Sequence, residues 1–304
     1  MPGEPTPLQR APASIARGRN LFLKREDRHE LGAFKWRGAL PTIEKFRRDG
    51  ASSVVTASTG NHGAAVAWAC RRLGLSAIVY APERASRAKL ALIEAQGAEI
   101  RLTGRDLDAA KDEGVRFARS EGIPFFEDGV ELTQYDGYAG IAEEILDQMS
   151  EPPAAVVVPV GNGALITGIG QALQARAPGT LLIGVAAKEA PVMALSHEAK
   201  RPVETSRMAT FADGLAVRIA IPAAVERVNA VTTRMTLVSE RAMALAIRDL
   251  AEAGIRAEGA AAAGIAALPL LPPVPGAIVA VVTGRNIDDE LYRRAIEDPD
   301  SFPD

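Results

Sequence analysis

The strongest constraint on the fold is a regular alternation of short apolar runs with segments of helical periodicity. The runs, rich in Val, Ile, Leu and Ala, lie at residues 21–24, 52–57, 76–81, 98–102, 154–160, 181–187 and 277–282. Between several of them, apolar residues recur every three or four positions at residues 61–73, 86–96, 106–119, 138–149 and 239–253. This pattern predicts parallel strands joined by crossover helices, in sheets that are covered on both faces.

Composition excludes several classes of protein. Hydrophobic residues make up 47% of the 304 and charged residues 24%, which is a globular balance and not that of a disordered chain. The 35 Lys and Arg against 38 Asp and Glu leave a net charge of −3, so the basic excess of a nucleic-acid binder is missing. The single cysteine, Cys70, cannot form an intramolecular disulfide, which fits a reducing cytoplasm. Residues 259–284 carry no charge, but their prolines favour buried core over a membrane span.

A lysine with aromatic neighbours stands at the start of a predicted helix. In LGAFKWRGA, residues 31–39, Lys35 lies between Phe34 and Trp36. Apolar surroundings favour the neutral amine, which is the group that forms an imine with an aldehyde cofactor. The alternative is a surface lysine whose stem covers an aromatic ring.

A turn between a strand and a helix carries small polar side chains. In TASTGNHGAA, residues 56–65, Ser58, Thr59 and Asn61 are residue types that cap helix N-termini. Unpaired amides at that helix start can bind a carboxylate or a phosphate, and a capped turn without a ligand is the alternative. His62 is interpreted as a polar residue at the helix start, and a histidine-based metal site is not expected.

Two further strands run into glycine turns. In VVVPVGNGALITGIGQAL, residues 156–173, Gly161 and Gly163 allow backbone N–H groups to converge on a phosphate, although a plain tight turn is the alternative. The spacing matches neither a P-loop nor G-x-G-x-x-G. In AIVAVVTGRNIDD, residues 277–289, Thr283 ends a buried strand, where open α/β sheets meet their ligands. A hydroxyl that caps the next helix is the alternative there.

Taken in order, these segments resemble the fold-type II pyridoxal-phosphate enzymes, and most closely their serine/threonine dehydratase branch. The resemblance covers nearly the whole chain through LFLKRED, GAFKWRGA, STGNHG, VPVGNGAL, FADGLAV, EGAAAAGIAAL and VVTGRNID. It implies an α/β fold like that of the tryptophan synthase β chain, with two domains of open, twisted, mostly parallel sheet and helices on both faces. Residues 1–50 and 132–304 would form the large cofactor-binding domain, and residues 51–131 a small mobile domain.

The resemblance also implies a role for each candidate residue. Lys35 would form the Schiff base with pyridoxal phosphate and move the proton at the substrate α-carbon, and Thr59 is the second catalytic candidate. Thr283 would face the pyridine nitrogen of the cofactor. The cofactor ring oxygen would meet Asn61, and its phosphate would lie among Gly161, Asn162, Gly163, Ala164 and Leu165. The substrate carboxylate would be held by Ser58, Thr59, Gly60 and Asn61.

Departures from the family pattern refine the expected activity. Thr59 stands where dehydratases and racemases have serine, and its extra methyl group disfavours racemisation. Ala186 and Val192 occupy positions where the metal site of a racemase expects acidic residues, so no divalent metal is expected. The VGNG turn is similar to the threonine synthase branch, which keeps a replacement reaction open.

The resemblance therefore implies a pyridoxal-phosphate ammonia-lyase that converts a β-hydroxy amino acid to a 2-oxo acid and ammonia. A β-replacement enzyme like cysteine synthase or threonine synthase is the alternative, ahead of a racemase or a non-catalytic cofactor-binding relative. The expected partner is a small amino-acid substrate, with no nucleic acid and no membrane. A cytoplasmic homodimer is expected by analogy with the family.

Overall fold

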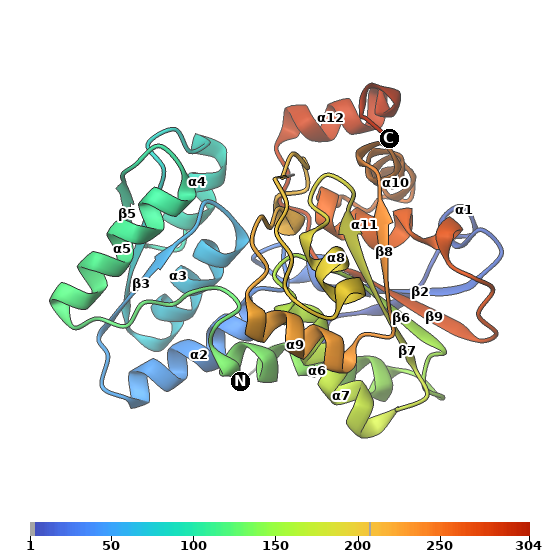
Figure 1. The fold of residues 1–304 in the computed structure, drawn as a ribbon, viewed down its shortest axis with the longest axis horizontal. Helices are drawn as coiled ribbons and strands as arrows, with labels where there is room; N and C mark the ends of the chain where they lie inside the picture. The colour runs from blue at the N-terminus through green and yellow to red at the C-terminus, as the bar shows by residue number, and fades with distance from the viewer. Residues whose placement is uncertain (1–3, 207) are drawn as a thin grey trace. The chain divides into compact units, whose positions relative to one another are not determined.

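The computed structural model describes residues 4–206 and 208–304, which divide into two compact units (Figure 1). The first unit comprises the described residues up to Phe34 together with Tyr138–Asp304, and the second unit comprises Lys35–Gly137. The second unit is thus inserted between two stretches of the first. Each unit has a sheet and a hydrophobic core of its own.

The second unit is built on a three-stranded parallel sheet in the order β3-β4-β5. Side chains alternate along β4, so Ile78 and Tyr80 pack with α5, while Val79 and Ala81 pack with α3 and α4 on the opposite face. Figure 1 shows α3 and α5 on either side of this sheet. Its elements are α2 (Trp36–Arg48), β3 (Ser53–Ala57), α3 (Asn61–Leu73), β4 (Ser76–Ala81), α4 (Arg87–Glu94), β5 (Glu99–Leu102) and α5 (Leu107–Glu121).

The first unit contains a six-stranded sheet within the described residues, in the order β1-β2-β9-β6-β7-β8. Only β1 runs antiparallel to its neighbour; the other pairs are parallel. Strand β9, late in the chain, lies between β2 and β6 and pairs with both. The strands are β1 (Leu8–Arg10), β2 (Asn20–Arg25), β6 (Ala155–Pro159), β7 (Leu181–Ala187), β8 (Arg234–Val238) and β9 (Ala277–Val282).

Helices cover both faces of this sheet. Val157 and Ala280 face the core that contains α10 and α11, while their neighbours Val156 and Val279 point to the other face and are buried as well. Helix α11, made of Ala, Gly and Ile, is buried all round, as expected for a helix that is apolar on every side. The helices are α1 (Ala13–Ala16), α6 (Leu132–Gln148, which crosses the boundary between the units), α7 (Ala164–Arg176), α8 (Val192–Ala199), α9 (Pro222–Val231), α10 (Glu240–Glu252), α11 (Gly259–Ala266) and α12 (Asp289–Glu297).

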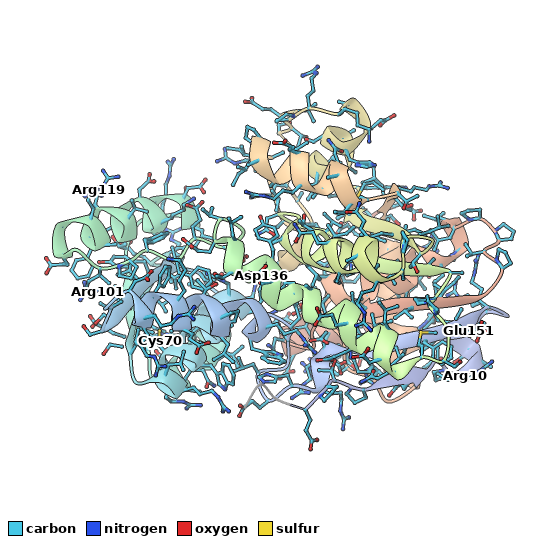
Figure 2. All side chains as sticks on the ribbon, turned by 90° about the horizontal axis from the view of Figure 1, so that it is seen from below. Arg10, Cys70, Arg101, Arg119, Asp136 and Glu151 are labelled. Atoms are coloured by element: carbon cyan, nitrogen blue, oxygen red, sulfur yellow. The ribbon has the colours of Figure 1, made fainter. Side chains whose placement is uncertain are left out.

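The structure confirms the α/β class with mostly parallel sheets and helices on both faces. All seven predicted strands are present within two residues of their expected ends, whereas β1 and β8 were missed, and α6 begins at Leu132 and not at Tyr138. Cys70 lies in α3 as expected (Figure 2). Its burial raises the pKa of the thiol to about 12. Within the described part of the chain, no helix combines the length and hydropathy needed to cross a membrane.

Candidate active site

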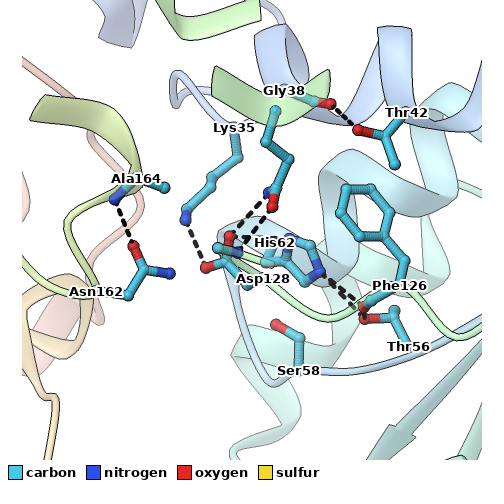
Figure 3. Close-up of polar contacts among 12 residues, drawn as sticks. Lys35, Gly38, Thr42, Thr56, Ser58, His62, Phe126, Asp128, Asn162 and Ala164 are labelled. Atoms are coloured by element: carbon cyan, nitrogen blue, oxygen red, sulfur yellow. Dashed lines mark hydrogen bonds and ion pairs between the residues drawn. The ribbon is translucent and has the colours of Figure 1, made fainter. Parts of the chain in front are cut away.

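An ion pair joins Lys35 to Asp128 in the second unit. Lys35 is the residue directly before α2, and its Nζ donates a hydrogen bond to Asp128 Oδ2 at 2.6 Å (Figure 3). The side chains of Lys35 and Asp128 are only 16% and 28% exposed. Because solvent screens such a pair weakly, the attraction is stronger than that of a surface salt bridge.

The expectation of an apolar setting for Lys35 is wrong, because its amine pairs with the Asp128 carboxylate and both aromatic neighbours pack elsewhere. The Phe34 ring packs on Tyr138 at 5.1 Å between centroids, in the first unit. The Trp36 ring meets Trp68 of α3 edge-on at 6.2 Å. The lysine amine faces the Asp128 carboxylate and not an apolar surface.

Asp128 is held in place by two further residues. Gln134 of α6 donates from Nε2 to Asp128 Oδ1 at 3.0 Å, and Nδ1 of His62 lies 3.6 Å from the same oxygen. Burial alone acts to raise the pKa of Asp128, but the Lys35 ammonium and these neighbours outweigh it and hold that pKa well below its usual range. Asp128 is therefore a carboxylate at any physiological pH.

His62 faces Asp128 from the first turn of α3 and is 7% exposed. Its Nε2 lies 3.1 Å from Thr56 Oγ1 and 3.4 Å from the Phe126 carbonyl oxygen. Burial lowers the pKa of His62, although the Asp128 charge opposes this, so the imidazole is neutral near pH 7. His62 is therefore more than a polar residue at a helix start: its ring packs against the Phe126 ring, and its Nδ1 faces Asp128.

The turn before α3 holds the residues expected to bind a substrate carboxylate. Ser58 is buried, and its Oγ accepts a hydrogen bond from Gly60 N at 3.2 Å. Gly60 is the N-cap residue of α3, and no side chain of the described residues caps this helix. The structure thus assigns the cap to Gly60, and not to Ser58, Thr59 or Asn61. A helix N-terminus without a side-chain cap favours anions through its N–H groups and its dipole.

The predicted phosphate loop joins β6 to α7 in the first unit. Gly163 has a φ of +88°, in the left-handed region that favours glycine. A Cβ on Gly161 would lie 2.3 Å from the Gly214 carbonyl oxygen, so only glycine fits there. Asn162 Oδ1 accepts a hydrogen bond from Ala164 N at 3.1 Å (Figure 3). The loop therefore offers mainly backbone at the N-terminus of a helix, which suits a phosphate.

Thr283 tests directly whether this chain fits a ring cofactor. It follows β9, is 2% exposed, and its backbone carbonyl accepts a hydrogen bond from Phe34 N at 3.0 Å. Its Oγ1 has no hydrogen-bond partner among the described residues. Leaving a buried hydroxyl without a partner costs free energy, and a hydrogen-bond acceptor on a bound ligand would remove that cost. The pyridine nitrogen of pyridoxal phosphate is such an acceptor.

The structure distributes the predicted site residues over both units. The second unit contains Lys35 and the 58–61 turn, and the first contains the 161–165 loop and Thr283. Sequence reasoning missed Asp128, which lies in the loop between α5 and α6. An acidic residue beside a glycine reads as a turn, and only the tertiary contact with Lys35 identifies it.

Comparison with known proteins relates the chain to one family of enzymes. The profile of the family described as "Pyridoxal-phosphate dependent enzyme" matches residues 1–284. Biosynthetic L-threonine dehydratase of Mycobacterium tuberculosis is 34% identical over 310 residues, which cover 96% of this chain and 70% of that protein. L-threonine ammonia-lyase of Thermotoga maritima is 34% identical over 285 residues, or 92% and 70% of the two chains. The chain spans only 42% of the biosynthetic L-threonine dehydratase of Pasteurella multocida, at 34% identity over 215 residues.

Solved structures show the same relationship. Processed threonine deaminase isoform 2 of Solanum lycopersicum superposes with a TM-score of 0.91 at 30% identity, over 97% of this chain and 88% of that one. Maize serine racemase gives a TM-score of 0.88 at 25% identity, over 96% and 92%. These matches confirm the resemblance to the fold-type II enzymes and to their dehydratase branch.

Proposed function

Since this chain belongs to the family of pyridoxal-phosphate dependent enzymes, we propose that it is an ammonia-lyase that converts a β-hydroxy amino acid to a 2-oxo acid and ammonia. The observation that carries the proposal is 34% identity over 310 residues to an L-threonine dehydratase, in a chain that keeps Lys35 at a paired, shielded position. L-threonine and L-serine are the first substrates to test.

The residues present fit the cofactor, on the strength of the Thr283 hydroxyl and the backbone-lined loop. Lys35 Nζ would hold its aldehyde covalently, Asn61 would contact its ring oxygen, and the loop from Gly161 to Leu165 would bind its phosphate. When bound, pyridoxal phosphate draws electrons from the substrate α-carbon, which makes the α-proton acidic and lets a β-substituent leave. Thr283 would donate its hydroxyl hydrogen to the ring nitrogen without giving up the proton, because an alcohol is too weak an acid.

The protein's own groups bind the substrate and move its proton. Ser58, Thr59, Gly60 and Asn61 lie at the start of α3, where N–H groups, hydroxyls and the helix dipole attract the substrate carboxylate. Once the substrate amine has replaced Lys35, Nζ of Lys35 is a base that can accept the α-proton and then carry it as an ammonium. Thr59 is proposed as a second group that positions a proton near the substrate.

The experiment begins with the covalent link. Reduction of the cofactor-loaded protein with borohydride, followed by peptide mapping, is expected to place the adduct on Lys35, and an adduct on any other lysine contradicts the proposal. Lys35→Ala should lose turnover by at least about a thousandfold. Lys45→Ala, which removes an exposed lysine of α2 paired with Asp49, is the control and should retain activity.

The reaction is then defined with a panel of L- and D-serine, L- and D-threonine and bulkier β-hydroxy amino acids, measuring 2-oxo acid and ammonia. A β-replacement enzyme is the second candidate, supported by the VGNG turn at residues 160–163, which is similar to the threonine synthase branch. Sulfide added to the serine assay separates the two. Release of 2-oxo acid should persist, and its suppression in favour of a thiol amino acid would establish replacement.

We also propose a homodimer in the cytoplasm, and a mobile small domain of residues 51–131 beside a large domain of residues 1–50 and 132–304. The habit of the family supports the dimer and the mobile domain. The single, buried cysteine supports the reducing environment of the cytoplasm. Light scattering on the purified chain tests the dimer, and hydrogen exchange with and without substrate tests the mobile segment.

A further inference from the structure

We propose that Asp128 is a positioning residue for the reaction, the fixed counter-ion that receives the Lys35 ammonium whenever the lysine is released from the cofactor. This inference rests on the proposed function, since it gives a partner to the proton that Lys35 takes from the substrate. Asp128 touches Lys35 and need not touch the substrate.

Geometry supports this role. The distance of 2.6 Å between Lys35 Nζ and Asp128 Oδ2 is that of a charge-assisted hydrogen bond. Gln134 anchors the aspartate from the other side, through Nε2 to Oδ1 at 3.0 Å and through Oε1, which accepts from Gly129 N at 2.7 Å. The carboxylate is thus fixed by α6 and its preceding loop, and it does not depend on Lys35 for its orientation.

The charges around Asp128 leave Lys35 as its main cationic partner. Among the described residues, the titratable groups that face it are Lys35, directly before α2, and His62, from α3. His62 is neutral near pH 7, so it presents a polar ring to Asp128 without a full positive charge. In the proposed reaction Lys35 alternates between a neutral and a charged form. An ion pair that only stabilised the fold would not need a lysine that does so.

The chemistry gives the pair two opposite effects. Attachment of the cofactor needs the neutral amine: the Lys35 ammonium loses its proton to solvent, the nitrogen forms a C=N bond to the aldehyde carbon, and water leaves. Asp128 opposes this step because it stabilises the ammonium. During turnover the amine takes a proton from the substrate, and Asp128 favours that step for the same reason.

The two effects give Asp128→Asn a signature that loss of structure cannot imitate. In the apoprotein, the pH midpoint for adduct formation with pyridoxal phosphate, read by absorbance, should move down by about one unit or more. In the loaded enzyme, kcat should fall by about 10- to 100-fold with little change in KM. Asp128→Glu keeps the charge and should return the midpoint towards the wild-type value.

Glu127→Gln is the matched control. It removes the neighbouring carboxylate, which pairs with Lys111 of α5, and should leave both the midpoint and kcat unchanged. Asp128→Ser provides a second neutral variant should the asparagine variant fold poorly, as judged by its thermal melt.

The outcomes separate this inference from the proposed function. If the wild-type chain forms no adduct on Lys35, the proposed function fails. If the wild-type adduct forms and the neutral variants share its pH midpoint, or if the glutamate variant behaves like the asparagine variant, the role of Asp128 is overturned and the proposed function stands.

Discussion

Thr283 is a residue at which a functional and a structural role can be distinguished by experiment. Thr283 is 2% exposed, and its hydroxyl has no hydrogen-bond partner among the described residues. Valine has nearly the same shape and would remove the cost of that atom. The unpartnered hydroxyl is consistent with the proposed contact to the cofactor.

Thr283→Val is expected to stabilise the apoprotein by up to about 1 kcal/mol and to weaken pyridoxal phosphate binding by about 3- to 10-fold, because one hydrogen bond is lost only in the complex. Urea unfolding and cofactor titration measure the two effects. Thr56→Val is the control: its Oγ1 donates to the Phe126 carbonyl oxygen at 2.8 Å, so this variant should lose about 1–3 kcal/mol. A destabilised Thr283→Val apoprotein would contradict the argument.

His62 makes stability depend on pH. Because burial lowers its pKa in the folded state, the unfolded chain binds a proton as pH falls below about 6.5 while the folded chain does not. Stability should therefore fall between pH 7.5 and pH 5.5, by up to about 1.4 kcal/mol per unit. Urea unfolding of His62→Gln should show a shallower dependence. His197, whose pKa burial also lowers, is unchanged in both proteins, so equal slopes would show that His62 is not responsible.

At the scale of elements, the conformation of the turn between β6 and α7 depends on Gly161 and Gly163, where a side chain would not fit. Gly161→Ala would place a Cβ 2.3 Å from the Gly214 carbonyl oxygen, and backbone on both sides must move. We expect a loss of about 1–3 kcal/mol in unfolding free energy and a larger loss of cofactor affinity. Gly179→Ala, where a Cβ would meet nothing within 4 Å, is the control in the same urea experiment. Equal stabilities for the two variants would contradict this account.

The same scale shows what the sequence could predict. Helix α3 and strand β4 have the bounds that their apolar patterns predict, since propensity and burial agree there. Strand β8, Arg234–Val238, was missed because its alternating Arg, Met and Thr at a sheet edge give no continuous apolar run. The first turn of α6 was missed because Thr133 and Asp136 are weak helix formers, whose conformation depends on packing.

The site divides in the same way. Lys35, the 58–61 turn, the 161–165 loop and Thr283 were proposed from residue types that follow strands or begin helices, which is local information. Asp128 became visible only through its contact with Lys35, 93 positions away in the sequence. Local patterns locate groups along the chain, whereas a counter-ion is defined by a distance that only the folded chain provides.

At the scale of the whole molecule, the first unit needs both ends of the described chain. Strand β9 pairs with β2 on one side and with β6 on the other. A chain ending at residue 276 should therefore lose the cooperative unfolding of the first unit, and its circular dichroism should fall by more than the missing residues account for. Retention of a sharp urea transition with near-full ellipticity in the shortened chain would show that β9 is dispensable.

The late position of β9 also has a consequence for biogenesis. During synthesis β2 and β6 are made long before β9, the strand that pairs between them, so this sheet cannot be completed until residue 282 has been added. Thr283 directly follows β9 and is added immediately after it. A polypeptide interrupted before residue 277 would therefore lack both β9 and the hydroxyl that we propose as a contact to the cofactor.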